Sequence, residues 1–589
     1  MILRINLSNG KIKEEPIDAE TKRKFVGGRG LGVKIIADEV DPKVDPLSEK
    51  NKIVFAVGPL TSTAAPTSGR YAIVSKSPQT GTIVDSNSGG FFAPMIKGQD
   101  YDAIIIEGKS SSPVYIWTND GKVEIRDASK IWGKDVEEST KALVKETDEK
   151  VKVACIGPAG ERLVRFACVI NDEHRAAGRG GIGAIMGSKN LKAVVALGGK
   201  KLQVADETKF KEVVKRCLMT IDKNQITKDS LRIMGTPALV SIINELGIFP
   251  TRNFQEGYSK EADGICGEKY LERIFVKQYA CYGCPIGCGR MTRAGGEEGG
   301  GPEYESLWAL GPECGVNELE DIARANYLCN RLGLDTISAG STIGCAMELS
   351  EKGYLDEEIK FGDSEKVLEL IRKIGMRDGI GQDLAEGSKR LAEKYGHPEL
   401  AMQAKGLEFP GYDPRGVQGH ALGYATSNRG GCHLRAYMIG PEALGVPAPI
   451  DRFKADGKAK IVKLLQDVSA AVDSLILCRF ASFAITVEEY ANLLTTATGI
   501  IYTPEEFRTV GERVWNMERL YNIRAGFGKK DDTLPQRFTE TTLKEGNSRG
   551  RVVELDKMLG EYYVARGWNS EGVPKPELLK KLEIEKYSL

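Results

Sequence analysis

The stretch Cys281-Tyr282-Gly283-Cys284-Pro285-Ile286-Gly287-Cys288 says most about how this chain folds, because three thiols fall within eight residues. The other cysteines among the twelve are scattered singly. Gly283 and Gly287 let the backbone wrap tightly, and Pro285 stiffens the turn. Such spacing is typical of the thiolates that hold an iron–sulfur cube, which needs a fourth ligand from elsewhere. Structural zinc is one alternative, although no second Cys or Cys/His pair accompanies the motif, and free thiols are another.

The composition is that of a globular protein large enough to enclose a cofactor. The 82 Lys and Arg balance the 82 Asp and Glu of the 589 residues, which argues against a nucleic-acid-binding protein. Apolar runs such as Ile53–Val57 are too short to span a membrane, and the N-terminus lacks a signal-peptide pattern. We therefore expect a cytoplasmic protein. Only four histidines are present, which argues against a multi-histidine metal enzyme.

Two patterns divide the chain. As far as about residue 200, short apolar runs alternate with Gly- and Pro-containing turns, which predicts strands. Beyond that point apolar residues recur every three and four positions, which predicts helices over Phe210–Ile221, Glu318–Leu332 and Asp383–Lys394, and later over Lys458–Leu477. A Gly-rich stretch from Gly406 to Gly440 reads as irregular.

One short pattern recurs. Asn330-Arg331-Leu332-Gly333-Leu334-Asp335 and Asp473-Ser474-Leu475-Ile476-Leu477-Cys478 each close a predicted helix. Taken alone, the pattern is typical of two helix C-termini, with Gly333 as a cap.

Three further segments carry residues with chemistry. Gly178–Gly183 has the spacing of a dinucleotide fingerprint, but the polar stretch before it does not read as the strand that this motif should follow. A loop that cradles phosphate or another anion, with Arg175 and Arg179, is the alternative. Taken singly, Glu305 reads as a solvated carboxylate and His433 as a structural histidine.

Together these segments resemble the tungsten-containing aldehyde:ferredoxin oxidoreductase family. The resemblance runs from end to end, through Pro59-Leu60-Thr61, Ser68-Gly69-Arg70-Tyr71, Asn87-Ser88-Gly89-Gly90, His174 to Gly181, the Cys281 motif, Pro302-Glu303-Tyr304-Glu305, Arg429 to His433 and Trp515 to Arg519. It implies an α+β fold in which a β-rich domain, residues 1–203, forms a base beneath two pyranopterins. Two mainly helical domains, residues 204–402 and 403–589, would cover them.

The resemblance also implies the cofactor ligands. Cys478 becomes the fourth ligand of a [4Fe–4S] cluster, beside Cys281, Cys284 and Cys288. Residues that bind the pterins are implied at Arg70, Asn87, Arg175, Ala176, Asn330, Leu334, Asp335, Arg435, Asp473 and Leu477. Within that set, the carbonyls of Asn87 and Ala176 would reach a magnesium ion that bridges the pterin phosphates.

The implied reaction is the oxidation of an aldehyde to a carboxylic acid at a tungsten held only by pterin sulfurs; molybdenum would fit the same pterins. Glu305 would act as general base, with a pKa raised by burial. His433 would hydrogen-bond the substrate oxygen or a metal oxo group. Electrons would leave singly through the cluster to ferredoxin or to a ferredoxin-like small subunit.

The chain departs from the family pattern in places. Asn330 and Ile476 stand where Asp and Gly are usual, and Arg435 replaces a lysine. The positions that hold an iron between subunits in homodimeric members are here Arg324, Tyr327 and Glu369. We therefore expect no interface iron, an ion pair between Arg324 and Glu369, and either a heteromer or an iron-free homodimer.

Two other functions compete with aldehyde oxidation. One is a low-potential reductase subunit of the same family, acting on an acid or an aromatic thioester. The other is a non-enzymatic zinc or iron–sulfur protein.

Overall fold

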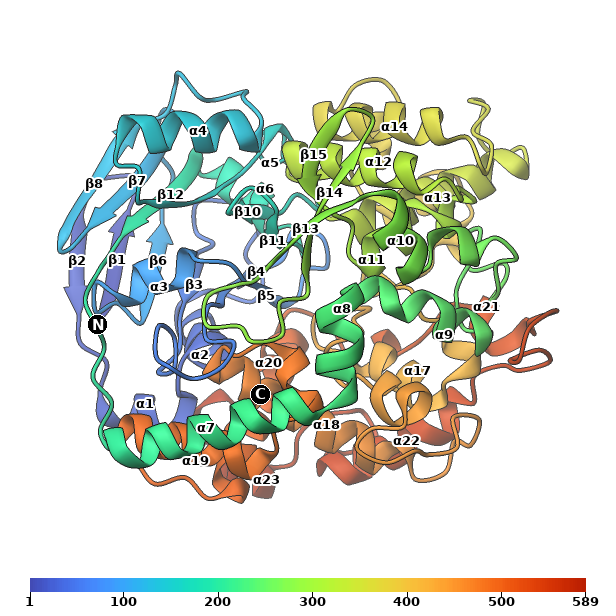
Figure 1. Cartoon of the computed structure of the whole chain (residues 1–589). Coiled ribbons are helices and arrows are strands. Elements are labelled where there is room, and N and C mark those ends of the chain that lie inside the picture. Colours follow the sequence, from blue (N-terminus) through green and yellow to red (C-terminus); the bar gives the residue numbers. More distant parts are fainter.

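Two six-stranded sheets occupy the first third of the chain in a computed structural model that describes residues 1–589 (Figure 1). The first sheet has the order β2-β1-β6-β3-β4-β5 and the second the order β11-β10-β9-β12-β7-β8. The strands are β1 (Ile2–Asn6), β2 (Ile12–Glu15), β3 (Ile53–Ala56), β4 (Tyr71–Lys76), β5 (Ile83–Ser88), β6 (Ala103–Glu107), β7 (Val114–Asn119), β8 (Lys122–Asp127), β9 (Lys152–Cys155), β10 (Val169–Asn171), β11 (Arg175–Ala177) and β12 (Leu191–Leu197).

The two sheets share one topology. In reverse, the order of the second sheet is β8-β7-β12-β9-β10-β11. Each of these strand numbers is six higher than the number at the same place in the first sheet. The only parallel pairs, β1 with β6 and β7 with β12, correspond to each other in this scheme. The N-terminal part of the chain is therefore an internal duplication, which the sequence analysis did not detect.

Alternation along the strands separates three apolar layers, because successive side chains point to opposite faces of a sheet. Leu3 and Ile104 of the first sheet share a core with Ile116 and Val194 of the second. The other face of each sheet packs under helices: α2 (Gly28–Glu39) and α20 (Pro504–Arg524) cover the first sheet, and α4 (Val136–Glu146) covers the second.

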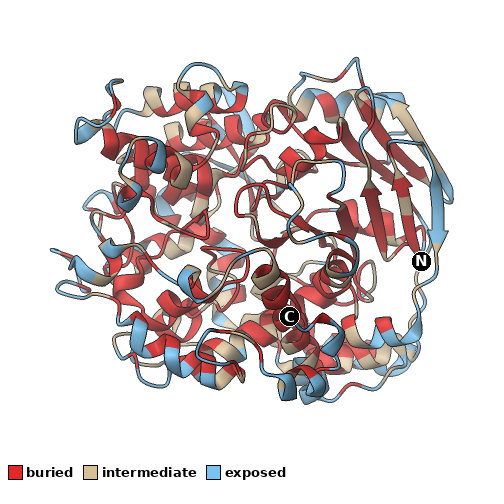
Figure 2. Ribbon diagram, turned by 180° about the vertical axis from the view of Figure 1, so that it is seen from behind, coloured by how far each residue is buried: buried red, intermediate tan, exposed pale blue.

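Helices dominate the rest of the chain, as Figure 1 shows on its right and lower sides. The main ones are α7 (Glu207–Lys223), α9 (Leu239–Glu245), α11 (Tyr304–Leu310), α12 (Leu319–Leu332), α13 (Thr336–Glu351), α14 (Ser364–Met376), α17 (Gln418–Thr426), α18 (Lys458–Leu475), α19 (Val487–Thr498) and α22 (Leu555–Arg566). All of these helices except α7 and α19 contribute to the largest core, of 77 buried residues, and Figure 2 shows the buried interior of the helices and strands in red. The α+β fold class is confirmed. None of these helices combines the length and the apolar character that crossing a bilayer requires.

Three local predictions were wrong. The segment predicted as one helix over Asp383–Lys394 forms two short helices, α15 (Gly381–Leu384) and α16 (Ser388–Lys394), separated at Gly387. The stretch read as irregular contains α17, all of whose residues are buried. The glycine motif at Gly178 does follow a strand, β11, and does precede a helix, α6 (Ile182–Ser188). That strand lies antiparallel to β10, however, so the motif is not part of the parallel βαβ unit that binds dinucleotides.

The two recurring hexapeptides end α12 and α18 in the same way. Each helix ends at the third residue of the hexapeptide, and the fourth, Gly333 or Ile476, takes the left-handed conformation with φ of 74° or 59°. The prediction of two helix C-termini is thus confirmed. The end of α18 packs against Gly58, just after β3, and the end of α12 packs against Gly157, just after β9. An ideal Cβ on Gly58 would lie 2.3 Å from the Leu475 carbonyl oxygen, and one on Gly157 would lie 2.3 Å from that of Leu332.

We expect Gly58→Ala to lower the free energy of unfolding by about 1–3 kcal/mol, because a methyl group at that distance forces backbone apart. Calorimetry at a fixed scan rate should show a lower thermal midpoint. Gly560→Ala is the matched control: Gly560 lies inside α22 with nothing within 4 Å of its Cβ position, so alanine should be neutral or stabilising there. Equal thermal midpoints for Gly58→Ala and the unsubstituted protein would contradict this packing argument.

Candidate active site

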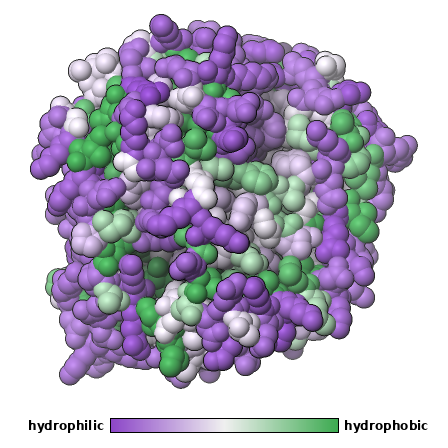
Figure 3. Space-filling view, turned by 60° about the vertical axis from the view of Figure 1, so that its left-hand side comes forward, coloured by the Kyte–Doolittle hydropathy of each residue, from purple (hydrophilic) through white to green (hydrophobic).

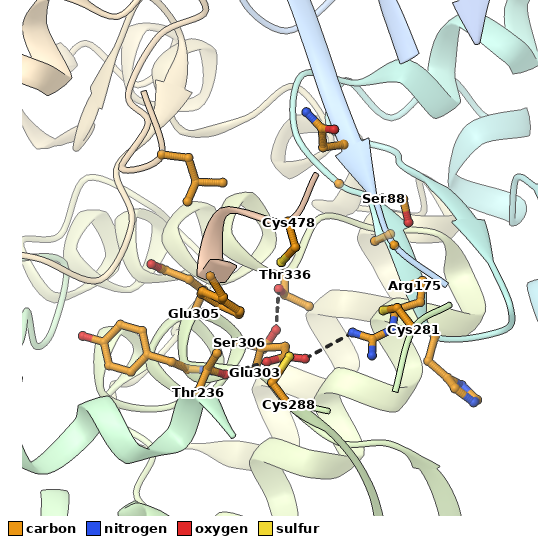
Figure 4. Close-up of a pocket in the computed structure, with 18 of the residues that line it drawn as sticks. Ser88, Arg175, Thr236, Cys281, Cys288, Glu303, Glu305, Ser306, Thr336 and Cys478 are labelled. Atoms are coloured by element: carbon orange, nitrogen blue, oxygen red, sulfur yellow. Dashed lines mark hydrogen bonds and ion pairs between the residues drawn. The ribbon is translucent and has the colours of Figure 1, made fainter. Parts of the chain in front are cut away.

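A cavity of about 320 Å³ lies between the sheets and the helical part of the chain (Figure 4). Most residues that the sequence analysis assigned to a site line it: Arg70, Asn87, Arg175, Ala176, Cys281, Cys284, Cys288, Glu305, Asn330, Leu334, Asp335, His433 and Cys478. Arg435, Asp473 and Leu477 do not line this cavity and are buried. The structure therefore gathers residues from across the whole sequence around one volume.

The four predicted cluster cysteines line this cavity together, although Cys478 is remote from the others in sequence. No three His, Cys, Asp or Glu side chains converge on a point where one metal ion could be held, so the thiols are spread around a volume. Burial raises the pKa of Cys284 to about 11 and that of Cys288 well above its ordinary value. A metal cluster would have to displace these protons when it binds.

Thr67 links the Cys281–Cys288 loop to Cys478 by hydrogen bonds. Its backbone N–H donates to the Gly283 carbonyl at 2.8 Å, and its hydroxyl accepts from the Cys478 N–H at 3.2 Å. The Cys281–Cys288 loop, which joins β13 (Phe275–Tyr279) to β14 (Gly289–Ala294), is also fastened by the Tyr282 hydroxyl, which donates to the Ser62 carbonyl at 3.2 Å. The β-rich base thus holds both the cysteine loop and Cys478 by hydrogen bonds.

Glu305 and His433 meet across the cavity. Oε1 of Glu305, on the first turn of α11, lies 3.6 Å from Nε2 of His433. Oε2 of Glu305 accepts from the Gly411 N–H at 2.9 Å, whereas Oε1 has no hydrogen-bond partner. Burial raises the pKa of Glu305 to about 8, and burial together with nearby cations holds the pKa of His433 well below its ordinary value. At neutral pH a protonated carboxyl therefore faces an uncharged imidazole.

An aromatic wall surrounds this pair. Tyr304, Tyr412, Tyr437 and Phe480 all line the cavity. The rings of Tyr412 and Tyr437 lie with centroids 5.9 and 6.3 Å from that of His433. A wall of this kind excludes water and offers apolar contact to an uncharged organic molecule.

Guanidinium groups lie in the cavity wall and close to His433. Arg175 lines the cavity, lies over the Tyr279 ring at 4.6 Å and places Nη1 3.6 Å from a Glu303 carboxylate oxygen, yet its buried Nη2 has no partner. Arg429 lies outside the cavity lining, and its buried Nε also lacks a partner, whereas Nε of Arg179 lies 3.2 Å from an Asp335 carboxylate oxygen. Buried donors without acceptors are costly, so this part of the structure fits an anionic group that supplies acceptors.

Asp473 belongs to a buried charge network, whose members are Arg29, Asp85, Asp473, Glu518 and Arg435. Oδ2 of Asp473 lies 3.1 Å from Arg29 and 3.0 Å from Arg435. Burial acts to raise the pKa of Asp85, but Arg435, Arg29 and Arg429 together lower it to about 2. All three acids thus find cations, which buried charges require.

This network also fixes the loop that carries His433. Glu518 accepts from the side-chain amide of Asn428 at 3.0 Å while it pairs with Arg29 at 2.7 Å. The sequence analysis missed Arg29, Asp85 and Glu518. One signal was available for Arg29, which stands within the glycine-rich run Gly27–Gly32 much as Arg179 stands within Gly178–Gly183.

The predicted ion pair between Arg324 and Glu369 is wrong. Arg324 instead pairs with Glu365 and Asp321, each at 3.0 Å, and Glu369 pairs with two lysines one turn away on its own helix. Glu365 lies one helical turn before Glu369 on α14, nearer to Arg324. The hydroxyl of Tyr327 forms a hydrogen bond with that of Thr292 at 2.6 Å.

Comparison with solved structures finds an enzyme of the same architecture. The structure described as "Active site complex BamBC of Benzoyl Coenzyme A reductase in complex with 1,5 Dienoyl-CoA" matches with a TM-score of 0.87 at 26% identity. The match covers 100% of this chain and 97% of that one.

Sequence comparison is more specific. The chain is 50% identical to a "Tungsten-containing aldehyde ferredoxin oxidoreductase" of Pyrococcus furiosus, over 99% of this chain and 98% of the relative. It is 48% identical to a protein of the same description from Thermococcus kodakarensis, with the same coverage, and 33% identical to an "Aliphatic sulfonate oxidoreductase, WOR-like subunit" of P. furiosus, over 99% and 96%. Family models match residues 2–198, as "Aldehyde ferredoxin oxidoreductase, N-terminal domain", and residues 212–584, as "Aldehyde ferredoxin oxidoreductase, domains 2 & 3". The chain belongs to the aldehyde ferredoxin oxidoreductase family.

Proposed function

We propose that this protein oxidises aldehydes to carboxylic acids and passes the electrons to a ferredoxin. The observation that carries the proposal is that the Glu305–His433 pair and four thiols line one cavity, in a chain 48–50% identical over nearly its whole length to relatives of that description. One aldehyde and one water yield one carboxylic acid, two protons and two electrons, and a ferredoxin that accepts single electrons must be reduced twice per turnover.

The residues present fit a tungsten bis-pyranopterin. Its anionic phosphates would meet the unpartnered donor of Arg175 in the cavity wall, and the unpartnered donor of Arg429 would add to the positive charge nearby. Arg70 borders the cavity beside Cys281, since an ideal Cβ on Gly89 would lie 3.3 Å from Nη1 of Arg70 and 2.9 Å from the Cys281 sulfur. When bound, the metal would accept the two electrons and an iron–sulfur cluster would carry them away singly.

The two hexapeptides support a pair of pterins. Asn330, Leu334 and Asp335 line the cavity and would hold one. Asp473 and Leu477 occupy the equivalent helix end and would hold the other, with Arg435 paired to Asp473. The two helix ends pack against equivalent glycines of the duplicated base. The base would therefore provide two similar binding sites for two identical pterins.

Asn87 and Ala176 are well placed to share a magnesium ion. They belong to β5 and β11, which correspond in the duplication, form the last strand of each sheet and contact each other. Each strand leaves backbone carbonyls along an edge without a strand neighbour, and oxygen ligands are those that magnesium prefers. An ion at this junction would lie between the two pterin-binding sites.

Glu305 would serve as the base and His433 as the group that orients the substrate oxygen. With a pKa near 8, Glu305 holds a proton at neutral pH and releases it as the pH rises. The uncharged imidazole can donate or accept a hydrogen bond without adding a charge to the site. The aromatic wall limits the access of water to both groups, whose side chains are 14% and 16% exposed.

We expect Glu305→Gln to lower kcat for aldehyde oxidation about 10²–10⁴-fold, because the amide cannot take a proton. In the wild type the rate should rise with pH through about 8, as Glu305 ionises, and this rise should vanish in the variant. Viologen reduction with a fixed aldehyde at several pH values provides the measurement. Glu313→Gln is the control: Glu313 is buried, and burial raises its pKa well above the ordinary value, but it does not line the cavity. A similar loss in both variants would contradict the role of Glu305.

Metal analysis tests the cluster. The wild type should contain about four irons and one tungsten per chain. Cys478→Ala should lose most of its iron and its cluster signal in electron paramagnetic resonance, since three thiolates hold a cube less firmly than four. Cys266→Ala, which alters a cysteine outside the cavity, should keep both. Zinc in place of iron, or full iron in the Cys478 variant, would show that the four thiols do not hold a cluster.

Substrate preference follows from the wall around His433. The wall consists of Tyr304, Tyr412, Leu434, Tyr437 and Phe480, which contribute no cation, so a carboxylate on the substrate would be buried against it without a partner. We expect kcat/KM for an aromatic aldehyde to exceed that for a carboxylate-bearing aldehyde at least about tenfold.

Tyr437→Leu should lower kcat/KM for the aromatic aldehyde about 2- to 10-fold, which corresponds to the loss of one aromatic contact. The surface variant Tyr354→Leu should leave kcat/KM unchanged, because Tyr354 is 42% exposed and lies outside the cavity. A preference for the charged aldehyde would overturn this prediction.

A further inference from the structure

A shallow hollow on the outer surface shares a wall with the central cavity. It is lined by Arg232, Gln278, Cys284, Pro285, Ile286 and Gly287, among others, and Cys284 and Ile286 line the central cavity as well. One of the four thiols therefore separates the interior from the surface. This hollow is therefore the part of the surface next to Cys284, and a cluster held by the four thiols would lie behind it.

Hydrogen bonds hold the hollow in shape. The side-chain amide of Gln278 donates to the carbonyls of Gly287 at 2.6 Å and Arg232 at 3.1 Å. Arg290 donates to the same two carbonyls, at 2.8 and 2.6 Å. The segment at Arg232 is thus fastened to the cysteine loop through backbone oxygens, which leaves the Arg232 guanidinium to face outward, 2.8 Å from the exposed carboxylate of Asp222.

Large apolar side chains are exposed beside the hollow. Phe275 and Val276 of the outer strand β13 are 38% and 36% exposed, and Ile233, next to Arg232, is 56% exposed. Most of the surface in Figure 3 is hydrophilic, with apolar side chains only in small patches. β13 is also an edge strand, with no neighbour beyond it. Exposed apolar side chains around a hollow are typical of a protein-binding site.

The rim of the hollow carries positive charge although the whole chain is neutral. From Ile274 to Gly296 the sequence has no acidic residue, and of its three cations Arg290 is buried and Arg293 pairs with Glu298, which leaves the charge of Lys277. Lys277 is exposed, and Arg232 faces the same hollow across Gln278. The Asp222 carboxylate that pairs with Arg232 is 61% exposed, so an incoming carboxylate can replace it at little cost.

We infer that this face, defined by Arg232, Ile233, Phe275, Val276, Lys277 and the Cys284–Gly287 turn, is where a small acidic one-electron carrier docks transiently. The inference rests on the proposed function, which requires such a carrier twice per turnover. A few apolar contacts within a basic rim match the small, electrostatically steered interfaces of electron-transfer partners. The docked carrier would take its electron across the turn that contains Cys284.

Charge reversal tests the docking face. Arg232→Glu and Lys277→Glu should each lower kcat/KM for ferredoxin severalfold at low ionic strength, and the double variant should lower it at least about tenfold, because steering is lost. Reduction of benzyl viologen, a small cationic dye, should stay within twofold of the wild type. Arg232→Lys and Lys277→Arg keep the charge and should keep the ferredoxin rate. Lys150→Glu, on the turn between α4 and β9, is the matched control and should change neither rate.

Salt gives a second measurement on the unaltered protein. Raising the ionic strength should slow ferredoxin reduction severalfold and leave viologen reduction unchanged. The inference is overturned if the double variant reduces ferredoxin normally, if it loses both activities together, or if a small subunit that survives high-salt purification covers this face.

Failure of the proposed function would look different. The wild type would then reduce no viologen with any aldehyde, while titration calorimetry would still detect salt-sensitive binding of ferredoxin that the double variant lacks.

Discussion

The close approach of two helix ends to two glycines is the constraint on which the rest of the structure depends. The carbonyl of Leu475 can rest against Gly58, and that of Leu332 against Gly157, only because neither glycine has a side chain. This contact fixes where α18 ends and therefore where Cys478 points. Together with Thr67, which hydrogen-bonds both Gly283 and Cys478, this contact brings Cys478 to the loop of Cys281. Backbone packing of the protein alone therefore brings the parts of the site together.

The duplicated base explains why the protein has two helix ends packed in the same way. Sequence differences between the two hexapeptides explain why the two ends differ. The sixth position of the hexapeptide is Asp335 in one copy and Cys478 in the other. Asp335 caps α13 by accepting from the N–H groups of Ile337 and Ser338, and it faces Arg179 at 3.2 Å. Cys478 instead accompanies the other thiols. One copy of the hexapeptide therefore ends in an ion pair, and the other ends in a thiol that lines the cavity with three more.

The sequence made the local features predictable. The cysteine spacing, the two hexapeptides and the apolar runs of β3, β4 and β6 carry their information within a few residues, and the structure agrees with them. The features that were missed depend on distant partners. β11 is a strand only because β10 pairs with it, and α17 is a helix within a glycine-rich stretch because it is buried on every side. Arg324 finds Glu365 rather than Glu369 because packing of α12 against α14 sets the register between them, and no pattern within either helix encodes that register.

The charges of the site show how the fold turns ordinary groups into chemically useful ones. Asp85 is buried and Glu305 is 16% exposed toward the cavity, and the pKa of Asp85 is lowered to about 2 while that of Glu305 is raised to about 8. The difference lies in their neighbours: Asp85 meets three guanidinium groups, whereas Glu305 receives a single backbone N–H and leaves Oε1 free toward the cavity. A carboxyl that stays ionised can hold a loop in place, and one that exchanges its proton near neutral pH can act on a substrate. The ionised acids around Arg29 hold the loop of His433, and that loop places Nε2 of His433 3.6 Å from the free oxygen of Glu305.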